Sequence, residues 1–123
     1  MTLLDTNVLI EIYRDNVNIA SIVENMQEIA VCDVVRAELF YGARNKRDLQ
    51  EISADLEELT VLSLLPQISE MAVNLVKTYC LSHKLEFADA LIAATAILYN
   101  AELFTLNRKD FAYIPNLKLY EQK

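Results

Sequence analysis

Short apolar runs alternate with helical patterns along the chain, and this alternation constrains the fold more than any other feature of the sequence. The runs that we expect to form strands are residues 3–4, 29–32, 60–62 and 102–105, with an edge strand over 117–120. Between them, apolar residues recur every three or four positions, which is the spacing of a helix with one buried face. Strands separated by helices pair in parallel. The sequence therefore predicts an α/β protein whose parallel sheet is covered by helices.

Local signals indicate where the helices begin and end. A first helix should run from residue 8 to residue 14 and end at Asp15. Asn18 is expected to cap a second helix over residues 19–26. Asp33 should cap a third helix that stops near Gly42, the only glycine of the chain. The remaining helices are expected over residues 45–59, 66–83 and 90–99, and the last is apolar nearly all round, which predicts a central buried helix.

Composition and charge limit the class of protein. A chain of 123 residues with 54% hydrophobic and 24% charged residues suits one globular domain over residues 1–123. The net charge of −7 argues against binding long nucleic acids through phosphate neutralisation, and it suits a basic partner. Cys32 and Cys80 are too few and too widely spaced for a disulfide framework, so we expect reduced, buried thiols in a cytoplasmic protein. No leader peptide and no membrane span are expected, because Asp5 interrupts the first apolar stretch and no run approaches about 20 residues.

Four carboxylates lie in or beside apolar sequence: Asp5, Glu38, Asp89 and Asp110. A charge beside buried surface costs roughly several kcal/mol unless it is compensated. A divalent cation would compensate all four if the fold brings them together. Asp5 and Asp110 follow predicted strands, and ligands of parallel sheets bind beyond the carboxyl ends of the strands. Without a cation, mutual repulsion should raise the pKa of at least one of these acids.

The sequence around these acids resembles four motifs of the PIN-domain nucleases, in the order of that family. The motifs are residues 3–10, 35–42, 87–96 and 103–111. The small size of the chain resembles the VapC-like toxins of toxin–antitoxin pairs. The resemblance implies a PIN-like α/β/α sandwich with a short-stranded central parallel sheet. It also implies an Mg²⁺- or Mn²⁺-dependent endoribonuclease, a homodimer, an RNA substrate and a small cognate antitoxin with a basic segment.

The resemblance assigns the catalytic and metal-binding acids by motif position. Asp5, Glu38 and Asp89 match the core acids of the family. At the fourth position some relatives carry the acid at the place of Asn107 and others at that of Asp110. We assign Asp110, and Asn107 stays open as the alternative because its amide oxygen can bind a ligand or a water.

Polar and basic neighbours could support these acids. Thr6, Asn7 and Thr105 could orient a carboxylate or the attacking water, although ordinary capping would explain them equally well. His83, the only histidine, is expected to cap helix carbonyls or to be solvated, with no catalytic role. The candidates for contacts with RNA phosphates are Arg36, Arg44, Arg108 and Lys109, each of which could instead be a solvated charge.

Two other functions compete with the nuclease. An aspartyl-nucleophile phosphatase often carries a second aspartate two residues after the first, and here that place is Asn7. A catalytically inactive PIN-like interaction module would keep the fold and retain the acids only as structural residues. The presence of all three core acids argues against that second alternative.

Overall fold

Five parallel strands form one sheet at the centre of the computed structural model, which describes residues 1–121. The strand order is β3-β2-β1-β4-β5. The strands are β1 (Thr2–Leu4), β2 (Ile29–Cys32), β3 (Thr60–Leu62), β4 (Glu102–Phe104) and β5 (Lys118–Leu119). The predicted parallel sheet and its edge strand are therefore confirmed.

The first strand occupies the middle of this sheet. Leu3 lies opposite Ala30 of β2 on one side and opposite Leu103 of β4 on the other. All three side chains are fully buried. A strand that is covered on both faces needs apolar residues at successive positions, and this explains the apolar pairs Leu3-Leu4 in β1 and Leu103-Phe104 in β4.

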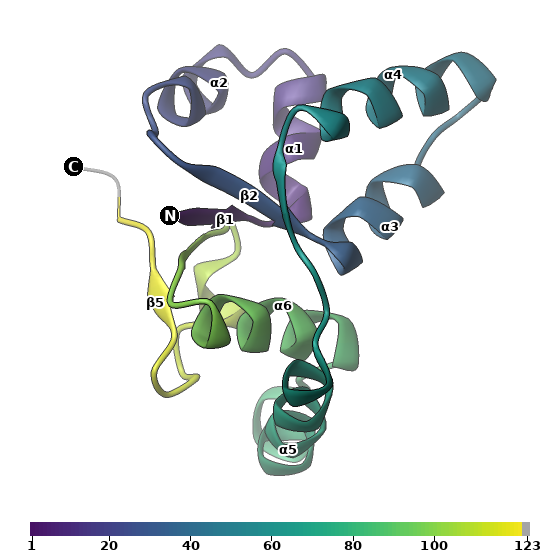
Figure 1. The fold of residues 1–123 in the computed structure, drawn as a ribbon. Helices are drawn as coiled ribbons and strands as arrows, with labels where there is room; N and C mark the ends of the chain where they lie inside the picture. Colours follow the sequence, from purple (N-terminus) through teal and green to yellow (C-terminus); the bar gives the residue numbers. More distant parts are fainter. Residues whose placement is uncertain (122–123) are drawn as a thin grey trace.

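Helices cover both faces of the sheet (Figure 1). The helices α5 and α6 lie on one side, whereas α1 and α2 lie on the other. In α6, every residue from 90 to 96 is buried, which confirms the predicted central helix. The helices are α1 (Thr6–Tyr13), α2 (Val17–Glu24), α3 (Asp33–Tyr41), α4 (Lys46–Glu57), α5 (Pro66–His83) and α6 (Phe87–Leu98), with a short 3-10 helix η1 (Arg108–Asp110). The fold is the α/β/α sandwich that the sequence predicts.

Two predicted helix caps are wrong. The cap of α2 is Asn16 rather than Asn18, and its Oδ1 accepts a hydrogen bond from the Ile19 backbone at 3.2 Å. The chain can turn there because Asp15 adopts a left-handed conformation (φ 64°), which aspartate tolerates better than most residues. Asp33 is the first residue of α3 rather than its cap. Its carboxylate instead accepts a bond from the Leu64 backbone at 3.0 Å, which ties the start of α3 to the segment after β3.

Both cysteines are free, as expected for reduced thiols, but only one is buried. Cys32 ends a central strand, and Cys80 is exposed near the end of α5, so the expectation of two buried thiols is wrong for Cys80. The periodicity of α5 places an apolar stripe on one side only, and Cys80 lies outside that stripe. Within residues 1–121, no helix combines the length and the apolar character that crossing a membrane requires.

Candidate active site at the carboxyl edge of the sheet

The candidate site lies where β1 and β4 meet. These strands are neighbours in the sheet, although a hundred residues separate Asp5 from Thr105, the residues that follow them. To one side of β1 the sheet continues to β2 and β3, and to the other side it continues to β4 and β5. Such a change of direction leaves a crevice at the carboxyl ends of the strands. The side chains of Asp5 and Thr105 meet at this crevice, where Thr105 Oγ1 donates a hydrogen bond to Asp5 Oδ2 at 2.8 Å.

Asp5 is the most buried of the four acids, with 7% of its surface exposed. Its Oδ1 accepts a hydrogen bond from the Thr6 backbone at 2.8 Å, so the residue also caps α1. Burial raises the pKa of this carboxyl, the bonds from Thr105 and Thr6 lower it, and the charges of Glu38 and Asp110 raise it again. The net direction is upward. Asp5 is thus fixed in place by two donors and destabilised in its charged form by its surroundings.

Thr105 is the centre of a small hydrogen-bond network. Besides donating to Asp5, its hydroxyl accepts bonds from Asn7 Nδ2 at 3.3 Å and from the Asn107 backbone at 3.1 Å. Asn7 Oδ1 in turn accepts a bond from the Leu106 backbone at 3.1 Å. The network holds the loop after β4 against the start of α1. The supporting residues expected from the sequence therefore do lie together, and Asn107 joins them through its backbone.

Glu38 reaches the site from α3. Its Oε1 accepts a hydrogen bond from Thr6 Oγ1 at 2.6 Å, so the residue that follows Asp5 also positions the second acid. Although its neighbours in the sequence are apolar, Glu38 is exposed, while Val35 and Leu39 of the same helix face the core. Neither Arg36 nor Arg44 pairs with it.

Asp89 lies in the first turn of α6 and is partly buried. Its pKa is raised from 3.8 to about 6, first by burial and then by the charges of Asp5, Asp110, Glu38 and Glu86, in that order. The expected increase of a pKa is therefore present, but burial is its largest cause and repulsion comes second. Glu86, which precedes α6 and lies just outside the third motif, is therefore a further acid near the site.

The fourth acid of the candidate site, Asp110, lies in η1. Asp110 is exposed there, and its charge contributes to the raised pKa of both Asp5 and Asp89. The polar turn after β4 brings the chain to the surface before it reaches Asp110. Asn107 is exposed as well and acts in the network through its backbone N–H. Asp110 is thus the fourth negative charge acting on the other acids.

The donor set suits a hard divalent cation. Over residues 1–121, no lysine or arginine forms an ion pair with Asp5, Glu38, Asp89 or Asp110. In the same range, no three acidic, histidine or cysteine side chains are close enough together to form a complete metal-binding group. Mg²⁺ does not require three such side chains, since it usually keeps several waters and is held by one or two carboxylates. Oxygen ligands with unbalanced negative charge fit such an ion.

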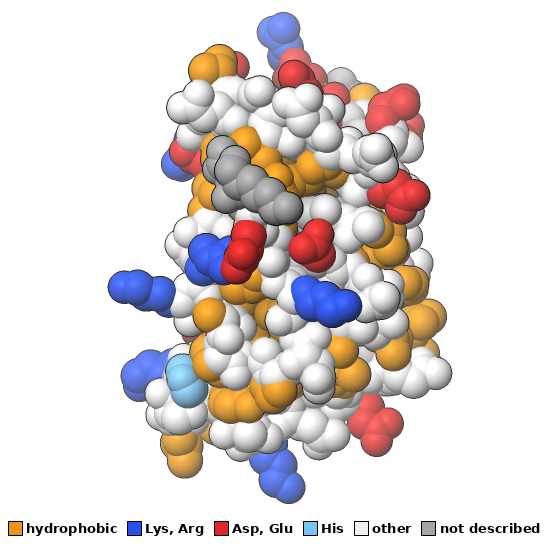
Figure 2. Space-filling view, turned by 90° about the vertical axis from the view of Figure 1, so that its left-hand side faces the viewer, with side chains coloured by type: hydrophobic (Ala, Val, Ile, Leu, Met, Phe, Trp, Pro, Cys, Tyr) orange, Lys and Arg blue, Asp and Glu red, His pale blue; other side chains and the backbone are white. Residues whose placement is uncertain are grey.

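The basic residues proposed to contact RNA are mostly engaged elsewhere. Arg36 pairs with Asp33 at 3.1 Å and Arg44 with Asp48 at 2.9 Å. Arg108 donates to the Tyr120 carbonyl at 2.9 Å. Lys109 is exposed and makes no ion pair within the described residues 1–121. Acidic and basic side chains are interspersed on the face drawn in Figure 2, which therefore presents no continuous basic track.

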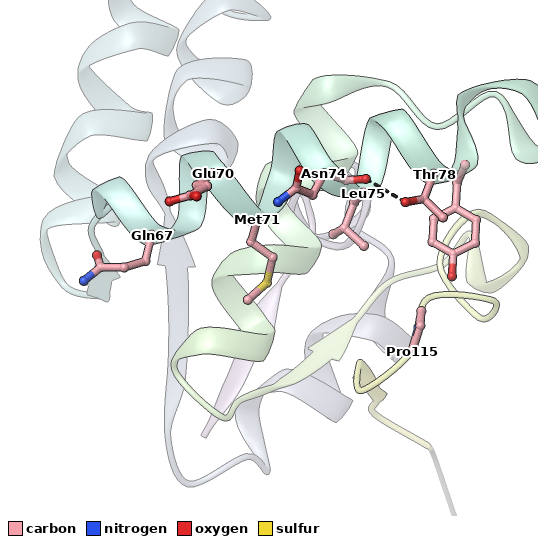
Figure 3. A pocket seen from close by; sticks show the side chains of 8 residues that line it. Gln67, Glu70, Met71, Asn74, Leu75, Thr78 and Pro115 are labelled. Carbon is pink, nitrogen blue, oxygen red and sulfur yellow. Dashed lines mark hydrogen bonds between the residues drawn. The ribbon is translucent and has the colours of Figure 1, made fainter.

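Two open grooves border the helices. The first connects with the site through Glu38 and is lined by residues of α1, α3 and α4, namely Ile10, Tyr13, Arg14, Glu38, Leu39, Gly42, Ala43, Arg44, Asp48, Glu51 and Ile52. The second follows α5, where Met71 and Leu75 lie in line along the helix and Pro115 projects from a loop nearby (Figure 3). Its only charged residue is Glu70, and none of the four acids lines it. Only the first groove belongs to the acidic edge.

Known proteins are similar to this chain in sequence and in fold. The PIN domain family model matches residues 2–117. Ribonuclease VapC19 of Mycobacterium tuberculosis is 32% identical over 96% of this chain and 98% of its own length. Ribonuclease VapC of Rickettsia bellii is 30% identical over 95% of this chain and 92% of its own.

Solved structures of other proteins resemble this chain in the same way. A toxin–antitoxin complex from Klebsiella pneumoniae superposes with a TM-score of 0.83 at 31% identity, covering 99% of this chain and 100% of that one. VapBC2 from Rickettsia felis, solved with a DNA fragment from its promoter, gives 0.82 at 26% identity and covers 99% and 98% of the two chains. The motif order, the four acids at the sheet edge and these similarities agree, and the chain belongs to the PIN-domain family as a VapC-like member.

Proposed function

We propose that this chain is a metal-dependent endoribonuclease and the toxin of a toxin–antitoxin pair. The observation that carries the proposal is the convergence of Asp5, Glu38, Asp89 and Asp110 at one edge of the sheet, where no arginine or lysine of residues 1–121 forms an ion pair with them. Their charges contribute, after burial, to the raised pKa of Asp5 and Asp89. Its similarity to two ribonucleases of the VapC type supports RNA as the substrate.

Each acid has a role that follows from its position. Bound Mg²⁺ or Mn²⁺ would neutralise charge on the scissile phosphate and lower the pKa of a water for attack. Asp5 is the rigid ligand, because Thr105 and the Thr6 backbone hold both of its oxygens. Asp89 supplies a carboxylate whose ionisation at neutral pH favours a nearby cation. Glu38, oriented by Thr6, and the exposed Asp110 complete the negative edge and leave it open to a phosphodiester.

The competing functions explain fewer of these contacts. An aspartyl phosphatase often carries a second aspartate two residues after its nucleophile, but the residue two positions after Asp5 is Asn7. Both ends of the Asn7 amide are used in the Thr105 network and in the bond from Leu106. An inactive module would bind no Mn²⁺ at the acidic edge, so a metal titration separates it from the nuclease.

Removal of the metal tests the reaction. Purified wild-type protein should cleave RNA in Mg²⁺ or Mn²⁺, lose cleavage in excess EDTA, and recover it when the ion is returned in excess of the chelator. The reason is that the carboxylates alone repel the phosphate they must act on. Cleavage is followed on gels with end-labelled RNA. Equal cleavage rates with and without EDTA would refute the metal mechanism.

The groove beside Glu38 is where we place the antitoxin. It combines apolar residues such as Leu39 and Ile52 with the acids Glu38, Asp48 and Glu51 and the bases Arg14 and Arg44. The acids outnumber the bases by one, and a basic, partly apolar segment would suit this lining. The similar structures from Klebsiella pneumoniae and Rickettsia felis are toxin–antitoxin complexes. A basic segment in this groove would lie next to the acids and block them.

A pair of charge reversals tests this placement. Glu51→Lys should weaken binding of the cognate antitoxin by at least about tenfold, because it sets a positive charge against the basic segment of the antitoxin. Glu70→Lys is the matched control, since Glu70 is also an exposed helical glutamate but lines the α5 groove. Titration calorimetry measures both affinities. If Glu70→Lys weakens binding and Glu51→Lys does not, the antitoxin occupies the other groove.

A further inference from the structure

Three aromatic rings from two segments form one cluster at the end of α5. The rings of His83 and Tyr113 stack face to face, with centroids 3.7 Å apart and planes 14° from parallel. Tyr79, one turn earlier in α5, meets both rings edge-on, at 5.8 Å from His83 and 5.0 Å from Tyr113. The cluster joins α5 to the segment that follows η1. Sequence reasoning did not identify it, because thirty residues separate the two stacked rings.

Buried neighbours hold this cluster next to the candidate active site. Phe111 and Ile114 are 1% and 3% exposed and anchor the segment that carries Tyr113, three residues after Asp110. Leu85, 5% exposed, anchors the short connection from His83 to α6, the helix that carries Asp89. Burial raises the pKa of the Tyr113 hydroxyl, and the charges of Asp89 and Asp110 contribute to the same increase, as expected for a ring near these acids.

The stacked pair is presented at the surface rather than used in the core. His83 is exposed, and the histidine is visible at the molecular surface as the pale blue side chain of Figure 2. Tyr79 and Tyr113, in contrast, are partly buried against the hydrophobic core. Tyr113 is thus a fixed support, and His83 is the outer ring lying on it. The Nδ1 atom of His83 lies 2.8 Å from Ser82 Oγ, which also fixes the orientation of the imidazole.

We propose that the His83–Tyr113 stack is a platform on which a nucleobase of the RNA substrate stacks beside the cleaved phosphate. The inference rests on the proposed ribonuclease function and adds a positioning residue to it. Single-stranded RNA is commonly held by stacking unpaired bases on aromatic side chains. A chain with a net charge of −7 gains little from attraction to phosphates, so a contact with an uncharged base contributes a larger share of substrate binding.

The experiment compares three variants on an RNA whose cleavage position has been mapped with the wild-type protein. His83→Ala should lower kcat/KM about tenfold, mainly by raising KM, because it removes the stacking surface. His83→Phe keeps an aromatic ring and should restore most of the activity. Leu81→Ala, which changes a 94% exposed residue of the same helix, should behave as the wild type. Thermal unfolding confirms that all three variants are folded.

An abasic scan separates stacking from a merely structural role. Nucleotides on either side of the cleavage site are replaced one at a time by an abasic unit. At one position the wild type should lose about tenfold in kcat/KM, and His83→Ala should lose nothing more there, because the partner ring is already gone. Equal kcat/KM for His83→Ala and the wild type, full additivity at every position, or no recovery in His83→Phe would each overturn the platform while leaving the ribonuclease intact. A wild-type protein that cleaves no RNA in Mg²⁺ would instead overturn the proposed function and the platform together.

Discussion

Asp89→Asn should give a protein that is more stable than the wild type at pH 7.5 and at least about 100-fold slower in RNA cleavage. Residues that merely hold a metal ligand in place cost about 10- to 100-fold when removed, so loss of a ligand itself should cost no less. The gain in stability has a separate cause. The folded protein holds the Asp89 carboxylate in partly buried surroundings among other acids, and an amide of the same shape carries no charge there.

The pH dependence follows from the raised pKa of Asp89. Between pH 3.8 and about 6 the folded state binds a proton that the unfolded state has released, so the free energy of unfolding falls as pH rises through this window. A pKa raised from 3.8 to about 6 corresponds to at most about 3 kcal/mol of stability lost above pH 6. Solvent screening of this partly exposed side chain reduces the figure to about 1–2 kcal/mol. The dipole of α6 favours a negative charge in the first turn of the helix. It therefore offsets about 0.3–1 kcal/mol of the stability that Asp89→Asn is expected to gain.

Urea unfolding of the metal-free proteins at pH 4 and pH 7.5 measures this effect. Asp89→Asn should gain stability at pH 7.5 and little at pH 4, where the wild-type carboxyl is largely protonated when folded. Glu57→Gln, an exposed carboxylate on α4, is the matched control and should change neither value appreciably. Mg²⁺ should stabilise the wild type more than Asp89→Asn. A variant that is destabilised at pH 7.5, or stabilised equally at both pH values, would contradict the electrostatic account of the site.

Asp5→Asn should abolish cleavage to the same degree, again by at least about 100-fold, with the fold retained. Asparagine can still accept the bond from the Thr6 backbone through its carbonyl oxygen, and its size matches the pocket. It loses the second carboxylate oxygen, the one to which Thr105 donates, and with it the charge that a cation needs. Cleavage kinetics in Mg²⁺ and a thermal melt distinguish a lost reaction from a lost fold.

The control for Asp5→Asn is the same chemical change at Asp15. Asp15 is exposed, and asparagine tolerates its left-handed backbone (φ 64°) equally well. Asp15→Asn should therefore cleave as the wild type does. If Asp5→Asn retains wild-type kcat while it is folded, Asp5 is only the cap of α1 and the acids at the sheet edge have been misassigned.

The sequence was most informative where one residue has one dominant local preference. Pro66 at the start of α5 and Asn45 at the cap of α4 are where the local rules place them, because the backbone conformation of each is set by its own side chain. Asp5 was found because an acid directly after an apolar strand has few structural reasons to be there. These features needed no knowledge of the partner elements.

Exposure and contacts between distant residues could not be obtained in this way. Glu38 has apolar neighbours in the sequence, but it lies about 100° around the helix from Leu39, and only the packing of α3 decides which of the two faces the core. Asn16 and Asn18 are chemically equivalent caps, and the left-handed turn at Asp15 selects the first. The stack of His83 on Tyr113 depends on how α5 packs against the segment after η1, and no local sequence pattern predicts that tertiary contact.

The bond between Asp5 and Thr105 also determines when, during synthesis, the chain could become harmful. Asp5 is translated a hundred residues before the threonine that positions it, and Asp89 and Asp110 follow in the later part of the chain. A nascent chain that stalls before β4 contains the first acid without the strand that completes its surroundings. The candidate site therefore cannot be complete until the last part of the chain has been synthesised.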